Sequence, residues 1–174
     1  MTLISGIGDL LKQYTGNSPK PADVEQHFDQ VAQSVPSSSL ASGLAEALRS
    51  GQTPAFSQLA GKLFASGNGT QQASMLSGLM AAAGPSAISM FTGNNPNSPL
   101  AALLKSGQTA ATADQAASIP AADVEALAHS AHADNPSIID RMSEIYAQHP
   151  ALVKSLGAAA MAVAVKKIAE QHAA

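Results

Sequence analysis

A run without charge, from Leu156 to Val165, constrains the fold of this chain more than any other stretch. Lys154 precedes the run and Lys166 follows it, and the alanines and methionine inside it favour helix. A helix that is apolar all round must be buried on all sides. A membrane-spanning helix needs about 20 apolar residues, so this run is far too short to be one. The sequence therefore predicts a buried helix, opened by Pro150, at the centre of a water-soluble helical bundle.

The composition supports a helical core made of aliphatic side chains. Hydrophobic residues are 45% of the 174 residues, whereas aromatic residues are only 3%, so the core must consist mainly of Leu, Ile, Met and Ala. No stretch alternates apolar and polar residues over six positions, which argues against strands. We therefore expect an all-α fold, a compact bundle of eight or nine short helices. The length suits a single helical domain over residues 1–174, with the Gly/Asn/Pro-rich stretch Gly93–Ser98 as the best candidate boundary.

Several local signals predict where helices begin and end. Ser98 precedes a proline and is expected to cap a helix, and Thr112–Gln115 fits a capping box. Thr53, which also precedes a proline, is expected to cap another helix. The helix before it is expected to end at Arg49, with Gly51 as a left-handed cap.

The N-terminal segment Met1–Tyr14 places its apolar residues on one helical face, which predicts a short helix docked on the body. Membrane attachment would favour several basic residues on the polar face, and only Lys12 is there. No basic region precedes an apolar stretch, as it would in a signal peptide. The chain has no cysteine, which excludes disulfides and thiolate chemistry. We expect a cytoplasmic protein with no integral membrane segment.

Two parts of the chain echo each other at a constant offset. Ala22–Glu25 recurs as Ala122–Glu125, and Pro36–Ser37 recurs as Pro136–Ser137. Both copies of Ala-Asp-Val-Glu lie at the expected start of a helix, and both copies of Pro-Ser lie at the expected start of the helix that follows. This pattern predicts an internal duplication.

Three stretches carry a resemblance to a known family: His27–Ala32, Leu48–Pro54 and Tyr146–Lys154. They resemble an uncharacterised, alanine-rich bacterial family related to the YidB-like proteins, and the similarity covers most of the chain. The resemblance implies a bacterial, all-helical, cytosolic protein. It implies no activity.

Charge is almost absent from the middle of the chain. From Ser50 to Ala111 the only ionisable residues are Lys62 and Lys105. This pattern is typical either of a neutral polar surface or of a face that meets another subunit, a lipid or an apolar ligand, because charge is depleted in interface cores. The net charge of −3 argues against nucleic-acid binding through phosphate contacts.

The densest cluster of metal-ligating residue types is Glu125, His129 and His132, with Asp134 close by. On a helix these three residues, spaced four and three apart, can share one face, and imidazole and carboxylate groups bind zinc or iron. The spacing matches neither HExxH nor the Glu-x-x-His motif of di-iron bundles. The alternative interpretation is a solvated polar face.

From these observations we derive three hypotheses for the function of the chain. The leading hypothesis is a non-enzymatic protein that self-associates or binds a protein partner through its charge-poor middle. The alternatives are a carrier of an apolar small molecule or lipid between Ala/Met helices, and a metal-binding protein using Glu125, His129 and His132. No catalytic residue or cofactor is expected: the nucleophile elbow Gly-x-Ser-x-Gly does not occur, and Ser57 and Ser77 are expected to be exposed spacers. Asp140 and Glu144 are expected to form a solvated charged face.

Overall fold

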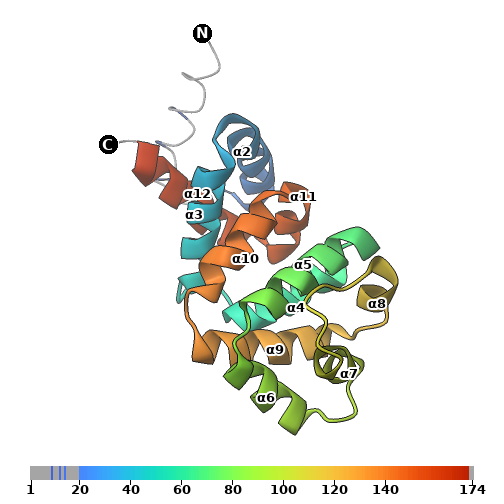
Figure 1. Cartoon of the computed structure of the whole chain (residues 1–174). Helices are drawn as coiled ribbons and strands as arrows, with labels where there is room; N and C mark the ends of the chain where they lie inside the picture. Colours follow the sequence, from blue (N-terminus) through green and yellow to red (C-terminus); the bar gives the residue numbers. More distant parts are fainter. Residues whose placement is uncertain (1–8, 10–11, 13, 15–19, 173–174) are drawn as a thin grey trace.

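Figure 1 shows the computed structural model of the chain, which describes residues 9, 12, 14 and 20–172. Within these residues the chain forms helices joined by short turns and contains no strand, so the predicted all-α class is confirmed. Helices are more numerous than predicted because short ones form in connecting segments. The elements are α2 (Pro21–Ser34), α3 (Ser37–Arg49), α4 (Phe56–Ser66), α5 (Gly69–Ala82), α6 (Pro85–Asn94), α7 (Pro99–Lys105), α8 (Ala113–Ala117), α9 (Ala121–Asp134), α10 (Ile138–Ala147), α11 (Pro150–Val153), the 3-10 helix η1 (Lys154–Leu156) and α12 (Ala158–His172).

The predicted helix Met1–Tyr14 lies mostly outside the described residues. Its last residue, Tyr14, is described and is buried against α2. The Tyr14 hydroxyl forms a hydrogen bond with His27 Nδ1 at 3.0 Å, and the two rings meet edge to face. Burial, and secondarily the charge of Asp23, raise the pKa of Tyr14 to about 12.

The charge-free run before Lys166 differs from the prediction in two respects. The segment that begins at Pro150 is not one helix, because Gly157 has a φ of 95° and separates α11 and η1 from α12. In addition, α12 is buried along one side rather than all round. Its residues Ala160, Met161, Ala164 and Val165 are buried against α3 and α2. On the opposite side Ala159 is exposed and Val163 is half-buried, which small apolar side chains tolerate at little cost.

Close helix crossings at glycine hold the bundle together. At the crossing of α3 and α12, a Cβ added to Gly43 would lie 2.8 Å from the Ala164 carbonyl oxygen and 2.6 Å from Ile168 Cγ1. At the crossing of α5 and α10, a Cβ added to Gly78 would lie 2.0 Å from Ile145 Cδ1. At Gly43 only a residue without a side chain lets the two backbones approach so closely, whereas at Gly78 the space is filled by the end of the Ile145 side chain.

The echoed sequences form equivalent helices. α2 (Pro21–Ser34) and α9 (Ala121–Asp134) are both 14 residues long. Their first residues, and likewise their last residues, are separated along the chain by the same distance as the two copies of the echoed sequence. Val24 and Val124 are both buried in the first turns of these helices. Each helix is followed by a turn and then by α3 or α10.

Helices from the N-terminal half of the chain pack against helices from the C-terminal half. α2, the first helix of one half, packs against α12 of the other half, and α9 packs against α4, while α3 and α10 pack against each other. Two three-helix repeats related by a two-fold axis would pair in this way. The two halves are not identical, because α12 also packs closely against α3, whereas α4 makes at most slight contact with α10. Helices α5 to α8 lie between the halves in the sequence.

The stretch Gly93–Ser98 forms the last turn of α6 and the tight connection to α7. The Ser98 hydroxyl accepts hydrogen bonds from the amides of Leu100 and Ala101 at 3.1 and 3.3 Å, so the predicted cap is confirmed. The same hydroxyl donates to the Asp123 carboxylate in α9. The connection is thereby fastened to the second half of the chain. The buried apolar side chains of the described residues, from Tyr14 to Ala169, belong to one cluster.

Candidate functional site

The three residues of the metal hypothesis all lie on α9, but they have different surroundings. Glu125 is half-buried beside α4, where its Cβ is 3.2 Å from the position that a Cβ of Gly61 would take. His132 packs edge to face against Phe56, with 5.7 Å between the ring centroids. His129 is exposed. Among the described residues, no group of three or more His, Asp or Glu side chains is arranged to hold a metal ion. Metal binding therefore remains a prediction that no cluster of ligands among the described residues supports.

His129 and His132 instead line a surface depression with a volume of about 470 Å³. Its walls come from the end of α3 and the loop after it, from the first turn of α4, from α9 and from α10. We call it the histidine depression. Its lining is Leu48–Gly51, Thr53–Ser57, His129, His132 and Ile139. Leu48, Phe56 and Ile139 are almost completely buried and form an apolar floor, with exposed fractions of 4%, 3% and 2%.

The loop between α3 and α4 is held by its own hydrogen bonds. The Thr53 hydroxyl donates to the carbonyl oxygens of Ala47 and Ser50 at 2.6 and 3.0 Å, and it therefore closes α3 instead of capping α4 as predicted. The residue before α4 is Ala55, which has no side chain able to cap it. Gly51 does not have a positive φ, so it is not the left-handed cap that was expected. The first amides of α4 consequently have no side-chain acceptor at the edge of the depression.

Ser57 lies in the first turn of α4 and lines the histidine depression. Its exposed fraction is 9%, so the expectation of an exposed spacer is wrong. Ser77 was also expected to be exposed, but it is half-buried and its hydroxyl accepts a hydrogen bond from the Ala111 amide at 2.9 Å. The Ser57 hydroxyl, in contrast, makes no hydrogen bond to any described residue. The sequence feature that could have predicted the burial of Ser57 is its position directly after Phe56, at the start of a helix.

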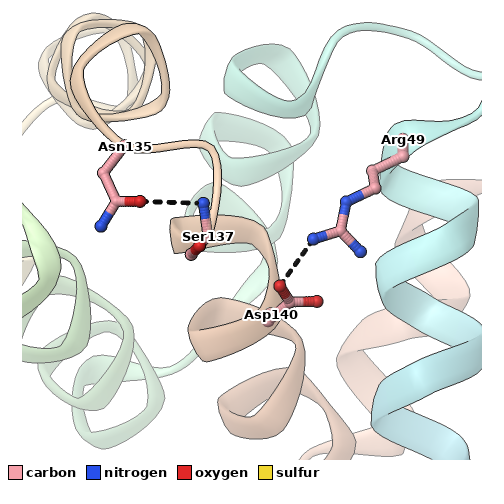
Figure 2. A network of polar contacts seen from close by, with 4 residues as sticks. All are labelled: Arg49, Asn135, Ser137 and Asp140. Carbon is pink, nitrogen blue, oxygen red and sulfur yellow. Dashed lines mark hydrogen bonds and ion pairs between the residues drawn. The ribbon is translucent and has the colours of Figure 1, made fainter.

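Arg49, which lines the depression, forms an ion pair with a residue of α10. Arg49 Nη2 at the end of α3 lies 2.6 Å from Asp140 Oδ2 in α10 (Figure 2). The hydrogen bond to this carboxylate raises the pKa of Arg49 above its ordinary value. Figure 2 also shows how α10 is opened: the Asn135 side-chain oxygen accepts a hydrogen bond from the Ser137 amide at 3.1 Å. Asp140 and Glu144 are both exposed, as expected of a solvated charged face.

A second candidate surface is formed by the charge-poor helices. From α5 to α7 the one ionisable residue is Lys105. We call the exposed side chains of α5, α6 and α7 the neutral surface. Met90 of α6 lies on it and is 49% exposed, the one large hydrophobic residue among those described that is exposed. Figure 1 places α6 and α7 at the end of the molecule opposite α2 and α12.

Other depressions in the described part of the chain are shallow and open to the surface. A depression of about 460 Å³ lies between α3 and α10 and is lined by Ser37, Ser38, Ala41, Ser42, Ala45, Asp140, Glu144 and Gln148. A depression of about 330 Å³ lies between α7 and α8. A carrier of an apolar molecule would need a cavity enclosed between helices, and these depressions do not have that form.

No helix in the described residues has both the length and the apolar character needed to cross a bilayer alone. The pair α5 and α6 reaches that length and composition only when taken together, and it is bent by 113° at the break.

Comparisons of the chain with known protein families, with curated proteins and with solved structures find no match. The resemblance to the YidB-like proteins therefore stays a prediction.

Proposed function

We propose that this chain is a non-enzymatic helical interaction module that self-associates through the neutral surface. The observation that carries the proposal is the charge distribution: α5 to α7 present one lysine, whereas acidic and basic residues are spread over the helices on either side in sequence. Charged side chains lose hydration when a partner covers them, so interface cores are depleted in charge.

A second copy of the chain is the partner that suits this surface. With a net charge of −3, two copies repel each other unless they approach through a face that carries little charge. The neutral surface is such a face. Met90 of α6, which is 49% exposed, supplies this face with a flexible apolar side chain that can adapt to its own symmetry mate. A two-fold contact of one face with itself also gives a closed dimer rather than a filament.

The alternatives have less support. A metal-binding role lacks a three-residue cluster among the described side chains, and a carrier role lacks an enclosed cavity among the depressions described above.

Sedimentation velocity over a wide range of protein concentration tests the proposal. The Met90→Glu variant places a charge at the neutral surface and is expected to abolish association. Ala159→Glu on α12 is the matched control, because it adds the same charge at an exposed position outside the neutral surface. We expect the wild type and Ala159→Glu to associate with rising concentration. A wild type that remains monomeric throughout, or a Met90→Glu variant that associates like the wild type, contradicts the proposal.

A further inference from the structure

The sulfur atoms of the chain differ in their access to solvent. The chain has six methionines and no cysteine. Met90 is 49% exposed, whereas four methionines are buried and at most 3% exposed: Met75, Met80, Met142 and Met161. Met1 lies outside the described residues. Within the described part of the chain, an oxidant in solution therefore reaches one sulfur directly, that of Met90, because methionine oxidation follows exposure.

The neighbours of Met90 on α6 leave its thioether open to solvent. On a helix, the side chains three and four positions away lie beside a given residue, and for Met90 the exposed ones are Ser86, Gly93 and Asn94. None of these is charged or bulky. Gly93 has no side chain, and nothing lies within 4 Å of a Cβ added there. α6 itself lies at one end of the molecule (Figure 1).

A peroxide is the class of oxidant that this arrangement suits. The sulfur lone pair of Met90 attacks one oxygen of hydrogen peroxide, so that an S–O bond forms, the O–O bond breaks and water leaves. The sulfur gives up two electrons, which the peroxide gains, and the product is methionine sulfoxide. Two thiols of a reductase reverse the step: they form a disulfide, the oxygen leaves as water and the thioether is restored.

We propose that Met90 is a reversible oxidation site and that its sulfoxide dissociates the self-associated chain. This inference rests on the self-association proposed above, through the neutral surface. Oxidation turns the flexible apolar side chain of Met90 into a polar one. Covering that polar group without a hydrogen-bond partner costs free energy, and a two-fold contact would cover two such groups.

Association and oxidation of Met90 oppose each other in both directions. If the sulfoxide weakens the contact, the contact in turn covers the thioether and slows its oxidation, since two events that share one surface are reciprocally linked. The chain would therefore be most sensitive to peroxide when it is dilute.

Peptide mapping by mass spectrometry during treatment of the full chain with hydrogen peroxide tests the accessibility of Met90. We expect Met90 to be oxidised at least about tenfold faster than the four buried methionines, and more slowly at high than at low protein concentration. In urea, where the chain is unfolded, all of these methionines should react at similar rates. Oxidation of Met90 in the folded chain that is no faster than that of the buried methionines overturns the proposal.

Sedimentation velocity of untreated, oxidised and reductase-treated chain tests the effect on association. Circular dichroism verifies that the oxidised chain is folded. We expect oxidation to weaken association at least about tenfold and the reductases to restore it. An untreated chain that stays monomeric contradicts the proposed self-association and this inference with it. An untreated chain that associates, and associates equally well after oxidation, overturns this inference alone.

Met90→Leu is the matched control, because leucine is apolar and of similar size but has no sulfur. The quantity compared is the association of this variant with and without peroxide, which is expected to be the same. The variant retains the other methionines, Met1 included. A Met90→Leu variant whose association falls with peroxide as much as that of the wild type places the effect at another residue and overturns the proposal.

Discussion

Gly43 in α3 lies so close to Ala164 in α12 that a Cβ at Gly43 would be 2.8 Å from the Ala164 carbonyl oxygen. The opposing atom belongs to a helical backbone, which cannot rotate aside as the end of a side chain can. The separation of α3 and α12 is therefore fixed by the absence of a side chain at Gly43. Because α12 also packs against α2, this contact sets the position of the whole C-terminal helix.

Replacing Gly43 with alanine is expected to destabilise the fold. Overpacking of a tight core contact costs about 1–3 kcal/mol, which exceeds the gain of roughly 0.5–1 kcal/mol that alanine brings to a helix. Gly78→Ala is expected to lose less, since the nearest atom there is Ile145 Cδ1, the mobile end of a half-buried side chain. Gly93→Ala is the control, because nothing lies within 4 Å of its added Cβ. The free energy of unfolding in urea should rank Gly43→Ala as the least stable; a Gly43→Ala variant as stable as Gly93→Ala refutes the close approach.

Removing the Ser98 hydroxyl is expected to cost about 1–2 kcal/mol of stability, the upper part of the range for a helix cap. Ser98→Ala loses the acceptor for the amides of Leu100 and Ala101 and also the donor to Asp123. Ser86→Ala, an exposed serine in the first turn of α6, is a suitable control. Equal midpoints of urea unfolding for the two variants would show that neither the cap nor the contact between Ser98 and Asp123 adds stability.

The ion pair between Arg49 and Asp140 is expected to add little stability. The side chains are 39% and 54% exposed, and pairs of this kind contribute about 0.2–1 kcal/mol. A double-mutant cycle with Arg49→Met and Asp140→Asn measures the coupling, which should fall as salt is added. A coupling that is large and insensitive to salt would mean that the pair is shielded from water.

Stability is expected to fall at alkaline pH. Burial raises the pKa of Tyr146 above its ordinary value, and the pKa of Tyr14 is raised to about 12. Between about pH 10, where an unfolded tyrosine ionises, and these higher values, only the unfolded chain releases the protons. Each such tyrosine lowers the unfolding free energy by at most about 1.4 kcal/mol per pH unit, so the contribution is complete below pH 10 and is lost above it. Tyr146→Phe should make the alkaline decline shallower; an equally steep decline in that variant contradicts the assignment to Tyr146.

The sequence predicted features that depend on neighbouring residues. The Ser98 cap and the Thr112–Gln115 capping box form as expected, because the donors and acceptors lie within one turn. The equivalence of α2 and α9 also follows from residues that begin each helix. Thr53 shows the limit of local signals: its hydroxyl had two sets of partners available, and it bonds to the end of α3 rather than to the start of α4.

The features that the sequence did not predict depend on contacts between distant segments. The break at Gly157 comes from a positive φ that nothing in an alanine-rich run requires. The histidines of the candidate site were found from the sequence as metal ligands with Glu125. Their actual neighbours, Phe56 and Ser57, come from α4, and only the antiparallel packing of α4 on α9 brings them together.

Hydrogen–deuterium exchange at low and at high protein concentration is the most direct test of the proposed self-association, because it locates the surface as well as detecting it. The account predicts that the amides of residues 69–105, which span α5 to α7, exchange more slowly at high concentration, while those of α2 and α12 do not change. Exchange that is the same at both concentrations, or protection confined to α2 and α12, contradicts it.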